Sequence, residues 1–594
     1  MTDASPFAAH FETNSVPLDH EIPGIKDYIA TCKDKSAAID AEIARLHSAL
    51  DELNFKSNEL RETINLHQGL ISPLRRNLDI LQEIFLHCLP TEHDSVISAR
   101  EAPVVLSHVC RSWRQMALST PRLWSSIYIS VPNVFLSQNP SEMDHLSYEW
   151  TQERWVTILE AIDIWLSRSG TCPLSVTVFD PSEVAYYQDN RWISPILEKV
   201  MANSTRLQRL VVHGAEDLLS VLGDLNPSNL PLLEDLVVEI SVPPWQTDAE
   251  TIWERFGILS APNIRRLCLR RFRRDPSMIP IVWAGLTHLS LESSHQYNAN
   301  LDNSLEILRQ CPRLFSLQIR IEMRKINIPQ PPHPVFLPHL LLLSVIINDE
   351  DDIPLFFETL HAPSLRELIF LGSTLLVGIN SLLKFLSQIQ ALRRFTFHPG
   401  CFDLQPLGKV LEACPHIVSL RSSLQFTDNA FWSTTRLPDS VWEGTMTEQD
   451  CQFGSALLKR LTPSDITDDD YLCPRLTSLE VKRGTFSPRE FVNFVLARDR
   501  KAHNTGGQLP RFRKSRIEFK NHWDSSPLNQ LPEDFTEVSF SFLSKGFNKK
   551  YGVRNGLDYQ MKLYPRFSRT PAPKTPGYDH RLFYIDDETG ENCL

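Results

Sequence analysis

The most reactive side chains are a carboxylate run and two neighbouring pairs of histidine and cysteine. Residues 468–470 read DDD, which could hold a divalent cation, but such a run in a turn is more typical of solvated charge. His87 precedes Cys88, and His108 stands two residues before Cys110, so each pair combines two metal-ligand types. Both cysteines lie on apolar helical stripes, which favours small buried side chains. The spacing therefore predicts no metal site.

Motifs that position nucleophiles, metals or phosphates are missing from the chain. It contains no GxSxG, HExxH, GxxxxGK[ST] or GxGxxG, and its 21 glycines are about half the usual frequency. We therefore expect a protein that is not an enzyme and that uses no cofactor.

Arginine is concentrated in RRLCLRRFRRD, which begins at residue 265 and holds six arginines. A planar guanidinium suits carboxylates and phosphates, so Arg266, Arg270 and Arg320 are candidate ligands for an acidic or phosphorylated segment of a target protein. The alternative interpretation is ordinary solvated charge.

Composition limits the class of protein and of partner. The 594 residues suffice for three or four domains, and a net charge of −12 without a long basic arm argues against nucleic acid. The eleven cysteines form no CxxC, so a reducing compartment is favoured over a disulfide framework. The first residues do not resemble a signal peptide, and no window approaches 18 apolar residues. We expect a cytoplasmic or nuclear protein without a membrane partner.

A repeat organises the middle of the chain. Ten approximate copies of L-x-x-L-x-L begin at residues 207, 233, 264, 286, 314, 340, 365, 392, 417 and 476. Most intervals are 22 to 31 residues, and the last, of 59, indicates an insertion or a degenerate copy around 425–470. This spacing is typical of a leucine-rich repeat, with one strand and one helix per turn. It predicts an α/β solenoid, a leucine-rich-repeat horseshoe, over residues 171–500, after a strand at 172–179.

Leucines of each repeat are expected in the core, and the alternating residues on the concave sheet face. Helical patterns between the strands often end at Cys-Pro or Ala-Pro, where proline stops the helix. The predicted concave positions are Asp235, Val237, Glu239, Arg266, Cys268, Arg270, His288, Ser290, Glu292, Ser316, Gln318 and Arg320, followed by a more apolar zone at Leu342, Ser344, Ile346, Ile369 and Leu371.

A heptad pattern occupies residues 36–70, after a polar stretch, 1–35, that we expect to be disordered. Apolar residues recur in alternating steps of four and three, at Ile39, Ile43, Leu46, Leu50, Leu53, Leu60 and Ile64, with Ser57 in the gap. Two interpretations stay open: a helix laid on the protein's own body, or a coiled coil that pairs with a second copy.

Three short apolar helices are predicted within residues 71–130. The segment reads SPLRRNLDILQEIFLHCLP and, after a charged loop, APVVLSHVCRSWRQMALSTPRLWSSIYI. It resembles the F-box of the large basidiomycete (mushroom) F-box-like family, which places a short coiled coil before the box. The chain departs from the family in reading NLDIL where the family usually has Leu-Pro-Pro-Glu-Ile-Leu.

The resemblance implies a substrate-recognition subunit of a cullin-RING ubiquitin ligase, whose F-box binds a Skp-type adaptor and through it a cullin. Carried over residue by residue, it implies these adaptor-binding residues: Pro73, Leu78, Ile80, Leu81, Ile84, Phe85, Val105, Leu106, Val109, Cys110, Trp113, Leu123 and Trp124. The alternative is an adaptor-independent interaction scaffold. A helical connector is expected at 131–170, and a partly disordered tail at 501–594.

Overall fold

The structure is a computed structural model of the whole chain. It describes residues 5–7, 11, 16–70, 77–91, 93–130, 145–179, 193–215, 222–223, 225–241, 256–272, 275–293, 300–321, 333–347, 349–372, 378–398, 402, 404–422, 453–464, 471–506, 508–519, 526–532, 535, 537–542 and 550–551. The chain divides into two compact units, Met1–Ile84 and Phe85–Leu594.

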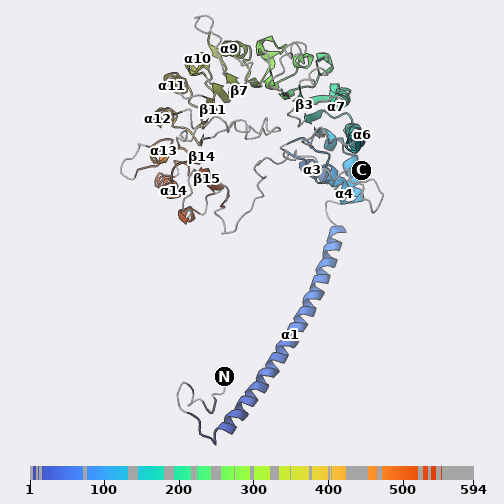
Figure 1. The fold of residues 1–594 in the computed structure, drawn as a ribbon, viewed down its shortest axis with the longest axis vertical. Helices are drawn as coiled ribbons and strands as arrows, with labels where there is room; N and C mark the ends of the chain where they lie inside the picture. The colour runs from blue at the N-terminus through green and yellow to red at the C-terminus, as the bar shows by residue number, and fades with distance from the viewer. Residues whose placement is uncertain are drawn as a thin grey trace. The chain divides into compact units, whose positions relative to one another are not determined.

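The first unit is dominated by one long helix, α1, which spans Ile22–Leu70 (Figure 1). It starts well before residue 36, so the prediction of disorder throughout residues 1–35 is wrong. Ion pairs at helical spacing, Arg45 with Glu42 and Lys56 with Glu52, support it along its length. Its predicted seam is 46% to 66% exposed. These exposed fractions describe the first unit by itself, so both interpretations of the seam stay predictions.

Short helices follow, as the apolar stripes predicted. They are α3 (Leu78–His87), α4 (Val104–Val109), α5 (Arg111–Leu118) and the 3-10 helix η2 (Pro121–Trp124). The boundary between the two units falls inside α3. Residues Ser126–Ser130 are not helical but form β1, the first strand of a large sheet. The segment 71–130 is therefore not an all-α unit, and the sheet begins about 45 residues earlier than predicted.

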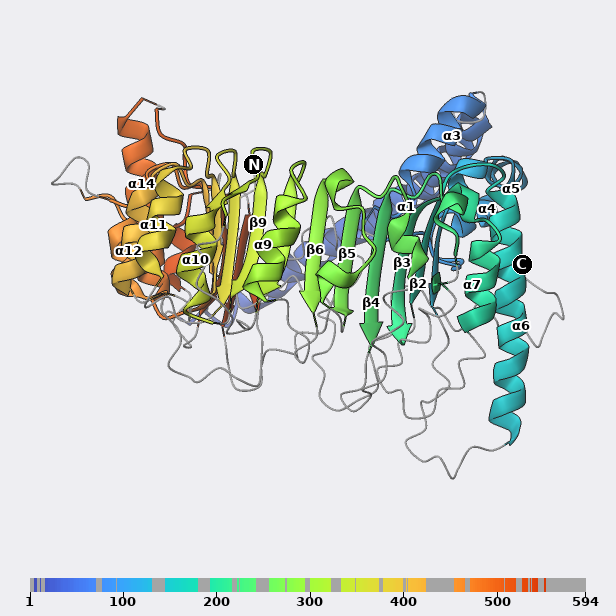
Figure 2. The same cartoon turned by 90° about the horizontal axis from the view of Figure 1, so that it is seen from above.

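The second unit is built on this sheet, which has fifteen strands within the described residues. Consecutive strands are parallel neighbours, except that β17 runs antiparallel to β16 (Figure 2). After β1 the strands are β2 (Leu174–Phe179), β3 (Leu207–Ala215), β4 (Asp235–Ser241), β5 (Arg266–Phe272), β6 (His288–Ser293), β7 (Ser316–Ile321), β9 (Leu342–Ile347), β11 (Glu367–Gly372), β12 (Arg394–Phe397), β13 (Ser419–Ser422), β14 (Ser478–Gly484), β15 (Lys514–Phe519), β16 (Glu537–Phe542) and β17 (Lys550–Tyr551). A separate pair joins β8 (Val335–Phe336) to β10 (Leu360–His361).

Helices and 3-10 turns connect the strands and cover one face of the sheet, the outer side of the curve in Figure 1. The helices are α6 (His145–Arg168), α7 (Ile193–Met201), α9 (Leu301–Arg309), α10 (Asp352–Thr359), α11 (Ile379–Ser387), α12 (Leu404–Ala413), α13 (Ser455–Leu461) and α14 (Pro488–Asn504). The repeat leucines pack beneath them: Leu207, Leu210, Leu236 and Leu267 have no exposed surface. This unit is a mixed α/β structure compatible with a solenoid.

Each of the ten predicted repeats contains a strand that starts at or up to two residues after the first leucine or isoleucine. The predicted concave positions also fall into register, since Asp235 pairs with Arg266 and Glu239 with Arg270 across β4 and β5. The 59-residue interval is an insertion, because β13 and β14 are direct neighbours. The positions of the strands follow from the period of the leucine repeat, because each strand must place its leucines on the face that the helices cover.

The sheet continues past residue 500, where a partly disordered tail was predicted. Strand β15 pairs with β14 through the basic segment after Arg511, and buries Ile517 and Phe519. Phe512 and Phe535, on either side of β15, are also buried. Within residues 508–519, 526–532, 535 and 537–542 the expectation of disorder is wrong, because two aromatic side chains anchor a segment that composition alone marks as solvated. Among the described residues, no helix has the length and hydropathy needed to cross a membrane.

Candidate partner-binding surfaces

Exposed apolar side chains lie on α3, the helix implied to touch the adaptor. Leu78, Ile80 and Ile84 are 51%, 48% and 37% exposed, although each is a large hydrophobic residue. Ile80 and Ile84 lie one helical turn apart and so share a face. Leu81, on another face of the helix, is only 1% exposed and is therefore wrong as an adaptor contact. Pro73 lies outside the described residues.

A second exposed pair stands where α4 ends and α5 begins. Val109 is 58% exposed, and Cys110, the residue between the helices, is also exposed. Val105 on α4 is half-buried, whereas Leu106 is buried and belongs to the core. Cys88 is exposed as well, so the prediction that Cys88 and Cys110 are small buried side chains is wrong. We call Leu78, Ile80, Ile84, Val109 and Cys110 the outward apolar residues.

The aromatic residues of this region hold the helices together. Phe85 is completely buried, and its ring meets the half-buried ring of Trp113 edge-on, with centroids 4.9 Å apart. This contact ties α3 to α5 and is worth about 0.5–1.5 kcal/mol beyond the buried area. Trp113 keeps part of its surface, but Phe85 cannot contact a partner. Its inclusion among the adaptor-binding residues is therefore wrong.

Trp124 joins η2 to the connector helix α6. Its indole nitrogen donates to the carbonyl oxygen of Ala117 at 2.8 Å, its ring packs edge-on against Trp165, and the Arg168 guanidinium lies over its face. Trp124 and the neighbouring Leu123 are 1% and 0% exposed. Leu106, Leu123 and Trp124 are therefore also wrong as adaptor contacts, because the chain's own packing uses them.

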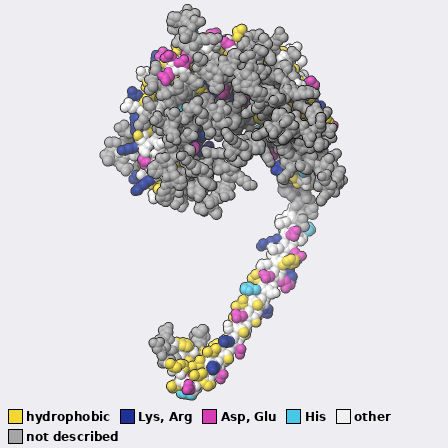
Figure 3. All heavy atoms as spheres, in the orientation of Figure 1, with side chains coloured by type: hydrophobic (Ala, Val, Ile, Leu, Met, Phe, Trp, Pro, Cys, Tyr) yellow, Lys and Arg dark blue, Asp and Glu magenta, His cyan; other side chains and the backbone are white. Residues whose placement is uncertain are grey.

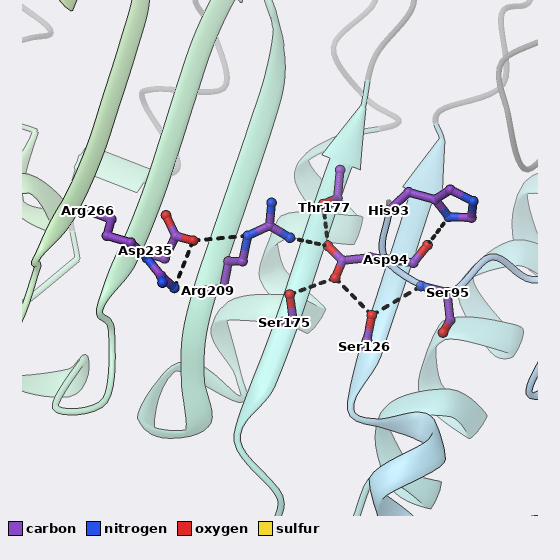
Figure 4. A network of polar contacts seen from close by, with 9 residues as sticks. All are labelled: His93, Asp94, Ser95, Ser126, Ser175, Thr177, Arg209, Asp235 and Arg266. Carbon is purple, nitrogen blue, oxygen red and sulfur yellow. Dashed lines mark hydrogen bonds and ion pairs between the residues drawn. The ribbon is translucent and has the colours of Figure 1, made fainter. Parts of the chain in front are cut away.

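The charged loop before α4 carries a buried carboxylate that no sequence pattern indicated. Asp94 is 5% exposed, and it accepts hydrogen bonds from the hydroxyls of Ser126 on β1 and of Ser175 and Thr177 on β2 (Figure 4). Its second oxygen lies 3.3 Å from Nη1 of Arg209 on β3. We call these five residues the Asp94 cluster.

Backbone pairing brings the loop to the sheet beside this cluster. Val96 forms a parallel bridge with Tyr128 of β1, and the Tyr128 amide donates to the Ser95 carbonyl oxygen at 2.7 Å. The Ser126 hydroxyl also accepts from the Ser95 amide. The loop thus covers the free edge of the first strand, which would otherwise expose unpaired backbone groups.

The ion pairs continue from the Asp94 cluster along the sheet. Nε of Arg209 lies 3.2 Å from Asp235 on β4, and the same carboxylate lies 3.2 Å from Nη2 of Arg266 on β5. Burial raises the pKa of Asp235, and the two arginines oppose this rise. Arg266, whose side chain is 36% exposed, already has an anionic partner in the chain.

A second ladder of basic and acidic side chains crosses β3 to β7, nearer the strand ends. It consists of His213, Glu239, Arg270, Glu292 and Arg320, with nitrogen–oxygen distances of 3.4 to 3.9 Å between successive partners. Burial lowers the pKa of Arg270, but Cys268, Glu239 and Glu292 outweigh it, so the net pKa lies above its ordinary value.

Arg270 and Arg320 are only 9% and 4% exposed in this ladder. Both the expectation of solvated charge and the expectation of cations available to a target are therefore wrong for these two residues. The physical reason is register, which places a carboxylate on the adjacent strand beside each guanidinium.

Accessible cations occur instead on the later strands. The side chains of Arg394, Arg421 and Arg516 are 61%, 38% and 71% exposed. They pair with Glu367 and Glu480 on neighbouring strands, so two carboxylates face three guanidiniums. The predicted concave positions end at Leu371. The same alternation, continued along the later strands, identifies these three arginines. We call these three arginines the late-strand arginines.

His288, on β6, gives this face a pH-dependent component. Burial, together with the charge of Arg266, lowers the pKa of His288 to about 4. An unfolded histidine titrates near 6.5, so the unfolded chain binds more protons between these values and stability falls as pH drops through this window. Between pH 7 and pH 5 we expect the wild type to lose on the order of 1–2 kcal/mol more than a His288→Gln variant, after discounting for partial exposure.

Denaturant unfolding of both proteins at the two pH values measures this difference. The titration of the remaining groups is common to the two chains and cancels. An identical loss in wild type and variant would show that His288 is protonated in the folded state without cost.

Metal chemistry finds no support among the described residues, which contain no group of three or more His, Cys, Asp or Glu that could hold an ion. The carboxylate run at 468–470 lies outside them. His87 and His108 are both exposed. Neither histidine–cysteine pair is joined by a third ligand in the described chain.

Comparison with known proteins adds little. No protein-family model matches the chain, and no curated protein matches it. One solved structure that is similar is a structural-genomics crystal structure of a protein from Bacteroides fragilis, at 13% identity. The alignment covers 46% of this chain and 71% of that one, with a TM-score of 0.29. A score this low carries no argument about fold or function.

Proposed function

We propose that this chain is an F-box-type substrate receptor of a cullin-RING ubiquitin ligase. In this proposal the α/β sheet is a leucine-rich-repeat horseshoe, and the helices between residues 78 and 124 are the F-box. The receptor breaks no bonds. It binds adaptor and target at once, which raises the effective concentration of target lysines near the loaded enzyme. Its site of action is the cytosol or the nucleus.

One observation carries the proposal: large apolar side chains stay exposed in the segment that resembles an F-box. Among the outward apolar residues, Leu78, Ile80 and Val109 expose about half of their surface. Leu78 and Ile80 lie three residues and one residue before the buried Leu81, and Val109 lies three residues after the buried Leu106, so the exposed side chains belong to helices whose other face is packed. Among the described residues the proposed adaptor contacts therefore reduce to the outward apolar residues together with Val105 and Trp113, and Pro73, which lies outside them, stays a prediction.

Target binding is assigned to the late-strand arginines rather than to the cations that the sequence suggested. Arg394, Arg421 and Arg516 lie on the sheet face away from the helices and remain accessible. An acidic or phosphorylated segment would displace or share their carboxylate partners, and a guanidinium binds such groups in bidentate fashion.

Binding of purified full-length chain to a Skp-type adaptor tests the proposal. The double variant Ile84→Asp with Val109→Asp removes two apolar contacts of about 1.5 kcal/mol or more each, which predicts a loss of affinity of about 100-fold or more. Isothermal titration or co-purification measures it. The matched control is Val282→Asp, because Val282 is 50% exposed on another part of the second unit and should leave affinity unchanged.

A second candidate function has one observation in its favour. The Asp94 cluster and the Val96 bridge fasten the loop of the F-box-like segment to β1, so this segment also works as a cap on the sheet. If this segment is only a cap and binds no adaptor, the chain is an adaptor-independent interaction scaffold. If wild-type chain at tens of micromolar does not bind the adaptor, the scaffold replaces the receptor.

A further inference from the structure

The structure extends the heptad seam of α1 far beyond its predicted length. Because the helix starts at Ile22, the alternating steps of three and four continue in the amino-terminal direction through Ile29, Ile25 and Ile22. Written as heptads, the a positions are Ile22, Ile29, Ser36, Ile43, Leu50, Ser57 and Ile64, and the d positions are Ile25, Cys32, Ile39, Leu46, Leu53, Leu60 and His67. Seven heptads are long enough for a stable pair of helices, whereas four are marginal.

The choice of residues at these positions favours two parallel strands. Isoleucine occupies four of the seven a positions, and leucine occupies the successive d positions Leu46, Leu53 and Leu60. Isoleucine at a with leucine at d is the combination that selects parallel dimers, because of how each side chain enters the hole in the facing helix. The seam is exposed in the single chain, and Figure 3 shows hydrophobic side chains distributed along the helix.

Polar residues within the seam define the register. Ser36 and Ser57 both occupy a positions, and in a parallel pair without offset each faces its own copy. A shift by one heptad would place Ser36 against Ile43, so a hydroxyl would face an apolar side chain.

Flanking charges contribute little to the choice of arrangement. In a parallel pair a g residue meets the e residue five positions later on the other helix. This places Lys35 against Asp40, an attractive pair, and Lys56 against Arg61, a repulsive pair, in both symmetry-related directions. The preference for the parallel pair therefore rests on the a and d positions.

We propose that α1 forms a parallel, in-register two-stranded coiled coil with α1 of a second copy of this chain. The protein is then a dimer that presents two copies of the second unit. The arrangement is independent of whether the chain binds an adaptor, and so survives or fails separately from the proposed function.

The mass of the full-length chain in solution is the first test. Light scattering under reducing conditions should give twice the chain mass of 68.1 kDa at micromolar concentration. The pair Leu50→Asp with Leu53→Asp should return the monomer. The matched control is Phe55→Asp, because Phe55 is 65% exposed and Leu53 is 66% exposed, but Phe55 lies at an outward f position. A monomeric wild type, or a dimer that resists the seam variant, overturns the proposal.

Cys32 reports the orientation, because a d position faces its own copy across a parallel seam. Mild oxidation should therefore produce a covalent dimer on a non-reducing gel, and Cys32→Ser should abolish it, whereas Cys88→Ser should not. In the Cys32→Ser background, Ser57→Cys should restore the cross-link and Ser48→Cys, at an f position, should not. The Ser57→Cys variant that keeps Cys32 holds both cysteines in one chain. If its only cross-link joins position 32 of one helix to position 57 of the other, the helices are antiparallel and the proposal fails.

Discussion

An Asp94→Ala variant should lose about 3–5 kcal/mol of unfolding free energy, the range for removing one partner of a buried ion pair. The three hydroxyls of Ser126, Ser175 and Thr177 would lose their acceptor, and Arg209 would lose one of its carboxylate partners while keeping Asp235. Denaturant unfolding followed by circular dichroism measures the loss. Amide exchange at Tyr128 should also accelerate, because this amide is protected by the same loop.

Two further variants show where the loss arises. Asp499 pairs with Arg511 at 3.8 Å on the surface, so Asp499→Ala should cost only about 0–1 kcal/mol. Combining Asp94→Ala with Arg209→Met should cost less than the sum of the single variants by about 1 kcal/mol or more, since the stranded guanidinium is then removed. If Asp94→Ala costs no more than Asp499→Ala, water replaces the lost acceptor and the Asp94 cluster does not hold the loop.

Arg498→Met should produce a loss of similar size, about 3–5 kcal/mol, because three buried carbonyl groups would lose their donor at about 1–3 kcal/mol each. Arg498 lies on α14 and is 5% exposed, and its guanidinium donates to the carbonyl oxygens of Leu461, Leu472 and Cys473 at 2.8 to 3.0 Å. Burial lowers the pKa of Arg498 to about 10, which leaves it charged at neutral pH.

The carbonyl groups that Arg498 binds lie at the two ends of a segment within the insertion before β14. One guanidinium therefore joins Leu461 at one end and Leu472 and Cys473 at the other to α14, and it lies over the rings of Tyr471 and Phe494. Arg489 is on the same helix and is exposed, so Arg489→Met serves as the control and should change stability by less than about 0.5 kcal/mol. Unfolding of both variants by denaturant gives the comparison, and equal stabilities would contradict this role of Arg498.

Local periodicity was enough to predict the strands of the sheet. Each repeat places leucines on alternate positions, and a strand with one covered face must turn those positions inward. The positions of Asp235, Arg266 and His288 on the opposite face follow from the same alternation, and the observed register agrees. The seam of α1 was recognisable for the same reason, although its start at Ile22 was missed because proline and glycine at positions 23 and 24 disguise it.

The ends of the sheet were not predictable in this way. Strand β1 lies within what reads as a helical unit, and β15 lies in a segment whose charge suggests solvent. Both are strands because the neighbouring strand offers unpaired backbone groups, which is a property of the assembled sheet and not of the segment itself.

Sequence alone determined which residues alternate, recur and cluster: the repeat, the heptads and the apolar stripes of α3 to α5. Only the tertiary structure decided which of two apolar faces turns inward, since Leu81 and Phe85 are buried while Ile80 and Ile84, equally apolar, are not. It also turned Arg270, Arg320 and the unremarked Asp94 into buried ion-pair partners. A side chain's character is local, but its burial and its partner depend on segments many residues away that fold against it.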